Sequence, residues 1–197
     1  MLSNSKLKNE VLKRTNEIKE DGYHQVILNI LYEEWQQRDN TSYKEVLDWY
    51  EEEYSKLAKF AVLVGKMNQQ VTNGGFLQYF HNGYCDGENG FESEHDSDIP
   101  LHQELVILFS ESGLKDEISL QVFQILQEFH ILLDTEETVE EDGYDEDEEY
   151  FIEMVDNENY GAVENVTYLS QLDSAYYKIC NEFMEILEKY FNNKILE

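Results

Sequence analysis

Apolar residues recur at helical spacing along most of the chain, with polar residues between them. A first helix is predicted to begin at Ser5, to carry Leu7, Val11 and Ile18 on its inner face, and to break at Asp21-Gly22. A second helix follows directly. Its inner face has apolar residues at three- and four-residue intervals: Tyr23, Ile27, Ile30, Leu31 and Trp35.

The same period continues after a loop predicted at 38–41. Ser42 and Glu45 have the spacing of a capping box, in which each side chain accepts a hydrogen bond from the other residue's backbone N–H. The charges of Glu51–Lys59 alternate in sign, which is typical of a solvated helix face. Further apolar positions continue this helix or begin a new one: Tyr54, Leu57, Ala61 and Val64.

Asn73-Gly74-Gly75 is predicted to end that helix, because glycine readily adopts the left-handed backbone conformation after a helix terminus. Phe76, Tyr79 and Phe80 then fall at i, i+3 and i+4, which predicts a short new helix with one buried stripe. Residues 82–100 contain three glycines and the only proline, so they are predicted to form a loop.

Two strong helical patterns follow, Leu101–Ser112 and Asp116–Leu133, with Gly113 between them. A last helix is predicted to begin at Asp173, whose carboxylate can cap it. No strand pattern competes with these helices. The predicted fold is therefore all-α: a single compact multi-helix domain, residues 54–197, with an N-terminal helical arm, residues 1–53.

The composition fits a folded chain without a membrane span. The 197 residues are 41% hydrophobic, which is too apolar for a wholly disordered acidic protein. No run of about 18 apolar residues exists, and the start carries no apolar signal-peptide region. Two cysteines, Cys85 and Cys180, make no disulfide framework. We therefore expect a reducing compartment, the cytoplasm, and no contact with a membrane.

The net charge of -29 is concentrated in one stretch. Met1–Lys66 holds 12 acids and 10 bases, whereas Met67–Tyr177 holds 27 acids and one base, Lys115. Within the latter, Asp134–Glu164 has 15 acids and no base. The candidate partner-binding residues are acids of this block: Asp134, Glu136, Glu137, Glu140, Glu141, Asp142, Asp145, Glu146, Asp147, Glu148, Glu149, Glu153, Asp156 and Glu158.

One segment resembles a known protein family. Val71–Asn82, which reads VTNGGFLQYFHN, is similar to the Asn-Gly-Gly-Phe-x-Gln-Tyr-Phe-x-Asn motif of a bacterial family of helical proteins that includes neisserial-type DNA mimics. Leu172–Tyr177 resembles the start of that family's C-terminal helix. Two features depart from the family pattern: Gln70 stands where an acid usually precedes the motif, and the acid-rich insert lies outside the shared segments. The resemblance implies an all-helical fold, DNA mimicry and homodimerisation.

The motif residues have a structural interpretation and a functional one. Gly74 and Gly75 permit a sharp turn, and the aromatic residues after them fill a core. The alternative is that Asn73, Gln78 and Asn82 bind a ligand on the polar face. We favour the structural interpretation, because aromatic stripes at helical spacing are usually buried.

Catalytic and metal sites have little support in the sequence. His81, Cys85, His95 and His102 can be drawn as a zinc site, but their spacing is loose, and solvated histidines with a buried cysteine are the favoured interpretation. The acidic run lacks the glycine and the acid spacing of an EF-hand. No catalytic triad, phosphate loop or dinucleotide motif is present. We expect no enzyme activity, no metal and no cofactor.

The acid block instead predicts binding to a basic protein. Two carboxylates about 6 Å apart, as at i and i+4 on a helix, repel by roughly 0.7 kcal/mol in water, so acids without bases sustain a negative field. That spacing is comparable to the charge pattern of a nucleic-acid backbone. We expect a DNA mimic that binds a repressor, nucleoid protein or nuclease and no nucleic acid directly. The alternative is an immunity-type module that neutralises a basic toxin without competing with DNA.

Overall fold

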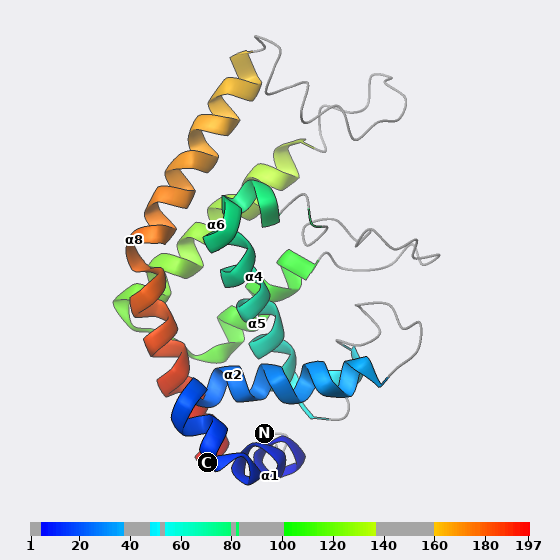
Figure 1. Cartoon of the computed structure of the whole chain (residues 1–197). Helices are drawn as coiled ribbons and strands as arrows, with labels where there is room; N and C mark the ends of the chain where they lie inside the picture. Colours follow the sequence, from blue (N-terminus) through cyan, green and yellow to red (C-terminus); the bar gives the residue numbers. More distant parts are fainter. Residues whose placement is uncertain (1–4, 38–47, 52–53, 80–81, 83–100, 137–159) are drawn as a thin grey trace.

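The coordinates are those of a computed structural model, and they describe residues 5–37, 48–51, 54–79, 82, 101–136 and 160–197. For residues 5, 132–136 and 160–167 they describe the backbone alone. Six helices have bounds within these residues, residues 48–51 are helical as well, and none of the described residues lies in a strand (Figure 1). The helices are α1 (Ser5–Lys13), α2 (Thr15–Gln36), α4 (Lys56–Tyr79), α5 (Leu101–Ser112), α6 (Glu117–Glu136) and α8 (Tyr160–Leu196). The all-α prediction is confirmed.

Helix α8 is the longest element and runs along one side of the whole molecule (Figure 1). It packs against α1, α2, α4 and α6, while α5 lies between α4 and α6. Both chain termini lie at the same end of the molecule, where α1 meets the last turns of α8 (Figure 1). Because α8 contacts both early and late helices, it ties the N-terminal arm to the rest of the fold.

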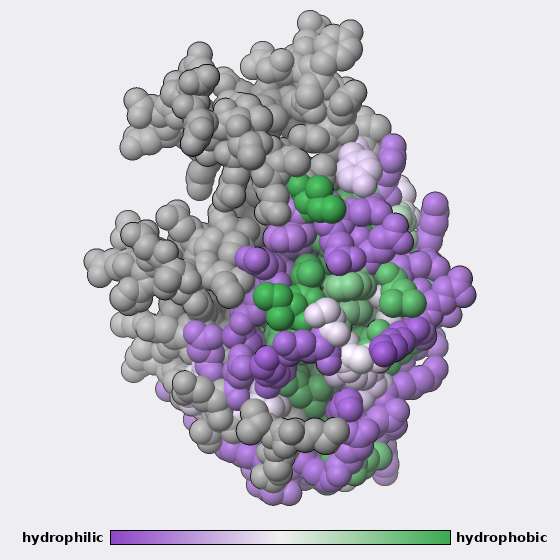
Figure 2. Space-filling view, turned by 180° about the vertical axis from the view of Figure 1, so that it is seen from behind, coloured by the Kyte–Doolittle hydropathy of each residue, from purple (hydrophilic) through white to green (hydrophobic). Residues whose placement is uncertain are grey.

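A single hydrophobic cluster runs through all of these helices. Leu7 of α1 and Ile27 of α2 are as fully buried as Phe183 and Phe191 of α8. Burying a side chain of this size stabilises the folded state by about 1.5–3 kcal/mol before the entropy of ordering it is counted. The predicted arm of residues 1–53 therefore shares its core with residues 54–197. Figure 2 shows the outer surface from behind, where hydrophobic side chains gather in the middle of the face beside hydrophilic ones.

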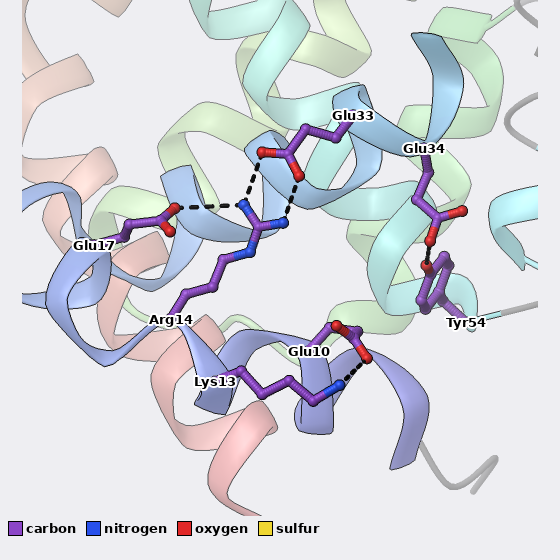
Figure 3. Close-up of polar contacts among 7 residues, drawn as sticks. All are labelled: Glu10, Lys13, Arg14, Glu17, Glu33, Glu34 and Tyr54. Carbon is purple, nitrogen blue, oxygen red and sulfur yellow. Dashed lines mark hydrogen bonds and ion pairs between the residues drawn. The ribbon is translucent and has the colours of Figure 1, made fainter. Parts of the chain in front are cut away.

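The predicted break at Gly22 is present as a kink, but an earlier break that the sequence pattern did not indicate precedes it. Helix α1 ends at Lys13, and Arg14 takes the non-helical angles φ -99° and ψ 41° before α2 begins. The Arg14 guanidinium donates to Glu33 at 2.8 Å and to Glu17 at 3.5 Å (Figure 3). Glu33 lies nineteen residues away, so this contact holds the corner through tertiary structure that the local sequence pattern does not contain.

Glu51–Lys59 was predicted to form a solvated face, which is wrong for Lys59, although Lys56 is exposed. Lys59 is 2% exposed, and its ammonium pairs with Asp48 at 3.0 Å and Glu51 at 3.3 Å. It also pairs with Glu104 of α5. Burial lowers the pKa of Lys59, but hydrogen bonds to Glu104 and Asp48 outweigh it and the pKa is raised. Local charge alternation therefore marks a buried ion cluster that joins α4 to α5.

Candidate functional site

Most of the predicted partner-binding acids lie outside the described residues. Asp134 and Glu136 belong to the last turn of α6, where the backbone is helical. The remaining candidates lie between 137 and 159: Glu137, Glu140, Glu141, Asp142, Asp145, Glu146, Asp147, Glu148, Glu149, Glu153, Asp156 and Glu158. The capping box at Ser42 and residues 83–100 of the predicted loop also lie outside. These assignments stay predictions.

The helices on either side of the acid-rich segment are described. The last residue of α6 and the first residue of α8 both lie toward the end of the molecule opposite the two termini (Figure 1). Helices α6 and α8 pack against each other, and the Tyr168 hydroxyl of α8 donates to Glu128 of α6. Both attachment points of the segment are thus fixed to one end of a helical body.

Acids near the termini are matched by bases. Glu10 pairs with Lys13 at 2.6 Å, and Arg14 bridges Glu17 and Glu33 (Figure 3). Lys194 pairs with Glu197 at 3.1 Å. Farther from the termini, the Tyr168 hydroxyl donates to Glu128 at 3.0 Å, so a neutral group takes the place of a base. The ion pairs partly cancel the field of the acids near the termini.

The Asn-Gly-Gly-Phe segment is a sharp kink inside α4. Gly75 has φ 78° and ψ -176°, a backbone region that only glycine occupies without strain. The Phe76 N–H after it donates to Asp173 Oδ1 of α8 at 2.7 Å. The predicted break at Asn73-Gly74-Gly75 is confirmed, and Phe76 and Tyr79 are buried as predicted.

Asp173 does not cap its own helix. Helix α8 begins at Tyr160, so Asp173 lies within it and its carboxylate caps the helical turn that restarts after Gly75. A Cβ added to Gly75 would lie 2.4 Å from Asp173 Oδ2, which shows how closely the two backbones approach. Burial raises the pKa of Asp173, against the lowering effect of the Phe76 hydrogen bond. The predicted cap was wrong because its partner lies ninety-seven residues away.

The polar residues of the motif also bond within the protein. Gln78 Nε2 donates to Gln70 Oε1 at 3.0 Å, and Asn82 Nδ2 donates to the same oxygen at 2.5 Å. The Tyr176 hydroxyl donates to Asn68 Oδ1 at 2.7 Å, and the Tyr177 hydroxyl donates to the Val71 carbonyl at 2.8 Å. This arrangement agrees with the structural interpretation of the motif.

A second kink was predicted at Asp21-Gly22 and has the same construction. Gly22 has φ 85° and ψ 171°. The N–H groups of Tyr23 and His24 donate to the carboxylate of Glu188 in α8, at 2.6 Å and 2.9 Å. Sequence analysis missed Glu188, although a signal was present. Leu187-Glu188 with Phe191 repeats the spacing of Leu172-Asp173 with Tyr176, and Gly-aromatic-x-Gln occurs at both 22–25 and 75–78.

His102 is buried, which corrects the expectation that the histidines of the drawn zinc site are solvated. His102 is 1% exposed; burial, reinforced by nearby His130, lowers its pKa to about 4 despite the hydrogen bond of Nε2 with the Leu126 carbonyl. His24 is buried and stacks on Phe191, with the ring centroids 4.8 Å apart and an angle of 12° between the ring planes. His81, Cys85 and His95 lie outside the described residues, and the rest of the chain brings no three potential metal ligands together.

Comparison with protein families, with curated proteins and with solved structures yields no match. The resemblance of Val71–Asn82 to the DNA-mimic family therefore stays a prediction. Among the described helices, none combines the length and the apolar character needed to cross a bilayer.

Proposed function

We propose that this protein is an acidic DNA mimic that binds a basic DNA-binding protein and competitively blocks its DNA contact. The observation that carries the proposal is the block Asp134–Glu164, with 15 acids and no base. A DNA-binding protein presents Lys and Arg to phosphates and gains free energy from counterion release. A dense set of carboxylates offers the same side chains an alternative partner.

The described part of the structure supports the proposal through the distribution of its bases. Lys6, Lys8, Lys13 and Arg14 lie on α1 or just after it, and Lys189 and Lys194 lie on the last turns of α8, all toward the termini. The acid-rich segment is attached at the opposite end (Figure 1). Such a charge asymmetry orients the molecule as it approaches a cationic partner and raises the association rate.

The mechanism needs no chemistry, cofactor or metal, because occupying the partner's DNA-binding surface is sufficient. We place it in the cytoplasm, in keeping with the free, buried Cys180. A homodimer, as the family resemblance implies, would present two acid blocks to a partner.

The decisive experiment is an affinity capture from the host extract, eluted in parallel with salt and with duplex DNA. The logarithm of the affinity should fall linearly with the logarithm of salt concentration, and DNA should displace the partner. A partner that salt releases but DNA does not displace would support the immunity-type alternative. Binding that is insensitive to salt would contradict both.

A matched pair of variants localises the interaction. The first neutralises four acids of the block: Glu140→Gln, Glu141→Gln, Asp145→Asn and Glu148→Gln. The control neutralises four exposed acids elsewhere: Glu20→Gln, Asp21→Asn, Glu182→Gln and Glu185→Gln. Because both variants change the net charge equally, the proposal requires a clearly larger loss of affinity in the first. Equal losses would mean that only the overall charge matters.

A further inference from the structure

A groove of about 510 Å³ lies between α2 and α4, with Met184 of α8 also lining it. Its floor includes Gly65 of α4, where an added Cβ would lie 3.0 Å from Leu28 Cδ1 and 3.3 Å from His24 Nε2. The missing side chain at Gly65 therefore lets α2 lie close against α4. The groove is distinct from the acid block and adjoins the Gly22 kink through His24.

The charge of this groove is opposite to that of the protein. None of the described residues that line it is acidic, and Lys66 is basic. Within the described chain, Lys66 makes no hydrogen bond or ion pair. Exposed lysines such as Lys178 also lack such a partner, but water solvates them fully, whereas Lys66 is half-buried. A partly desolvated ammonium without a carboxylate partner gains from a charge-assisted hydrogen bond to an anion.

Aromatic rings form another wall of the groove. Tyr32 and Trp35 meet edge to face, with ring centroids 6.1 Å apart at 82°. Tyr32 is 52% exposed, so much of its ring is available to a ligand. Edge-to-face rings form a corner against which a flat apolar body can pack.

Two carboxamides add hydrogen-bonding capacity. Asn29 Oδ1 accepts from Gln25, and Asn68 Oδ1 accepts from the Tyr176 hydroxyl. These bonds use the oxygens of the two side chains, and both residues line the groove, so their amino groups are available as donors. Donors beside an ammonium favour a carboxylate or sulfonate over a cation.

We propose that this groove binds a small organic anion with a flat apolar body. Its acidic group would bind Lys66 with the Asn29 and Asn68 amides, and its ring would pack against Tyr32 and Trp35. This inference goes beyond the proposed DNA mimicry and does not depend on it, since the acid block takes a cationic macromolecule and the groove takes a small anion.

The test uses 2-naphthoate as the probe, with 2-naphthalenemethanol as its neutral analogue and cyclohexanecarboxylate as an anion without an aromatic ring. Calorimetry on the native chain should show saturable binding of 2-naphthoate at one site per chain, at least about ten-fold tighter than either comparison compound. In a Trp49→Phe chain, Trp35 is the only tryptophan, and its fluorescence should change with the same dissociation constant.

Variants of Lys66 test whether its positive charge binds the probe. Lys66→Ala should weaken binding of 2-naphthoate about ten-fold, and Lys66→Arg should retain it within a few-fold. The matched control, Lys178→Ala, removes the same charge from an exposed position on α8 and should leave the affinity unchanged. No saturable binding, equal affinity for the anion and its neutral analogue, or an unchanged affinity in Lys66→Ala would overturn the proposal.

Discussion

Two glycine kinks interrupt helices, one at Gly22 in α2 and one at Gly75 in α4, and a carboxylate of α8 caps the turn after each. Asp173 and Glu188 are fifteen residues apart on α8, a rise of about 22 Å along a straight helix. One long helix thus satisfies the exposed N–H groups of two others. Carboxylates are suited to this position, because they accept these bonds and favour the positive end of the helix dipole.

The two kinks differ in how much room the carboxylate has. At Gly75 the short Asp173 side chain approaches within 2.4 Å of where a Cβ would stand. At Gly22 the longer Glu188 lies 2.8 Å from the corresponding point and can swing away. A groove of about 430 Å³ lies beside Glu188, so we expect water to reach the N–H groups if the carboxylate moves. The comparison predicts that replacing Gly75 with a larger residue destabilises the fold more than replacing Gly22.

The largest effect is expected for Gly75→Ala. Backbone strain and the contact with Asp173 together should lower the free energy of unfolding by about 4 kcal/mol. Gly113→Ala is the matched control, because Gly113 has a positive φ of 81° with nothing within 4 Å of an added Cβ, and we expect about 1 kcal/mol there. Urea unfolding measures both. Equal losses would show that strain alone, and not the contact with Asp173, sets the cost.

A second effect concerns the buried histidine near each kink. His102 packs against Tyr79, which follows the Gly75 kink, and burial lowers its pKa to about 4. His24 directly follows the Gly22 kink, and burial lowers its pKa as well. The unfolded chain, with a histidine pKa near 6.5, binds more protons than the folded chain below that pH. The free energy of unfolding should therefore fall as pH drops from about 6.5 to about 4, by about 3 kcal/mol for His102.

The measurement is urea unfolding at several pH values in this window. His102→Gln should flatten the pH dependence, since a glutamine can still donate to the Leu126 carbonyl but does not titrate. His24→Gln should also flatten the pH dependence, and the size of this change measures how far burial lowers the pKa of His24. An unchanged slope in both variants would mean that these histidines titrate normally in the folded protein.

Gly22→Ala should cost about 2 kcal/mol, which is the strain of placing alanine at this backbone conformation. The cost should be lower than at Gly75, because the Glu188 carboxylate can move aside. The double variant Gly22→Ala with Glu188→Ala tests this explanation. If Glu188 moves freely, the two losses should add, and strong coupling would show that the carboxylate is held as firmly as Asp173.

The smallest effects are expected from the caps themselves. Asp173→Ala should cost about 1.5 kcal/mol, because it leaves the Phe76 N–H without a partner in a closely packed region. Glu188→Ala should cost about 0.5 kcal/mol, since water can reach the N–H groups of Tyr23 and His24. The reverse order in urea unfolding would contradict the difference in solvent access inferred for the two kinks.

The acid block and the folded body differ in what the sequence could predict about them. The helical period, Leu101–Ser112 and the kinks at Gly22 and Gly75 could all be predicted, because each depends on residues within a turn or two of one another. The break at Arg14 could not be predicted, since Glu33 holds it from the far side of α2. The charge block is likewise a property of the sequence, while the arrangement of its carboxylates in space is a tertiary question.

The sequence by itself determined an all-α chain whose negative charge is concentrated in one segment, because both properties depend on local residue order. The tertiary structure alone decided that Asp173 caps the turn at Phe76, that Lys59 is buried among three carboxylates, and that Lys66 lies in a groove without an acid. The physical reason is the same in each case. A polar group takes the partner that folding brings near it, and that partner can be anywhere in the chain.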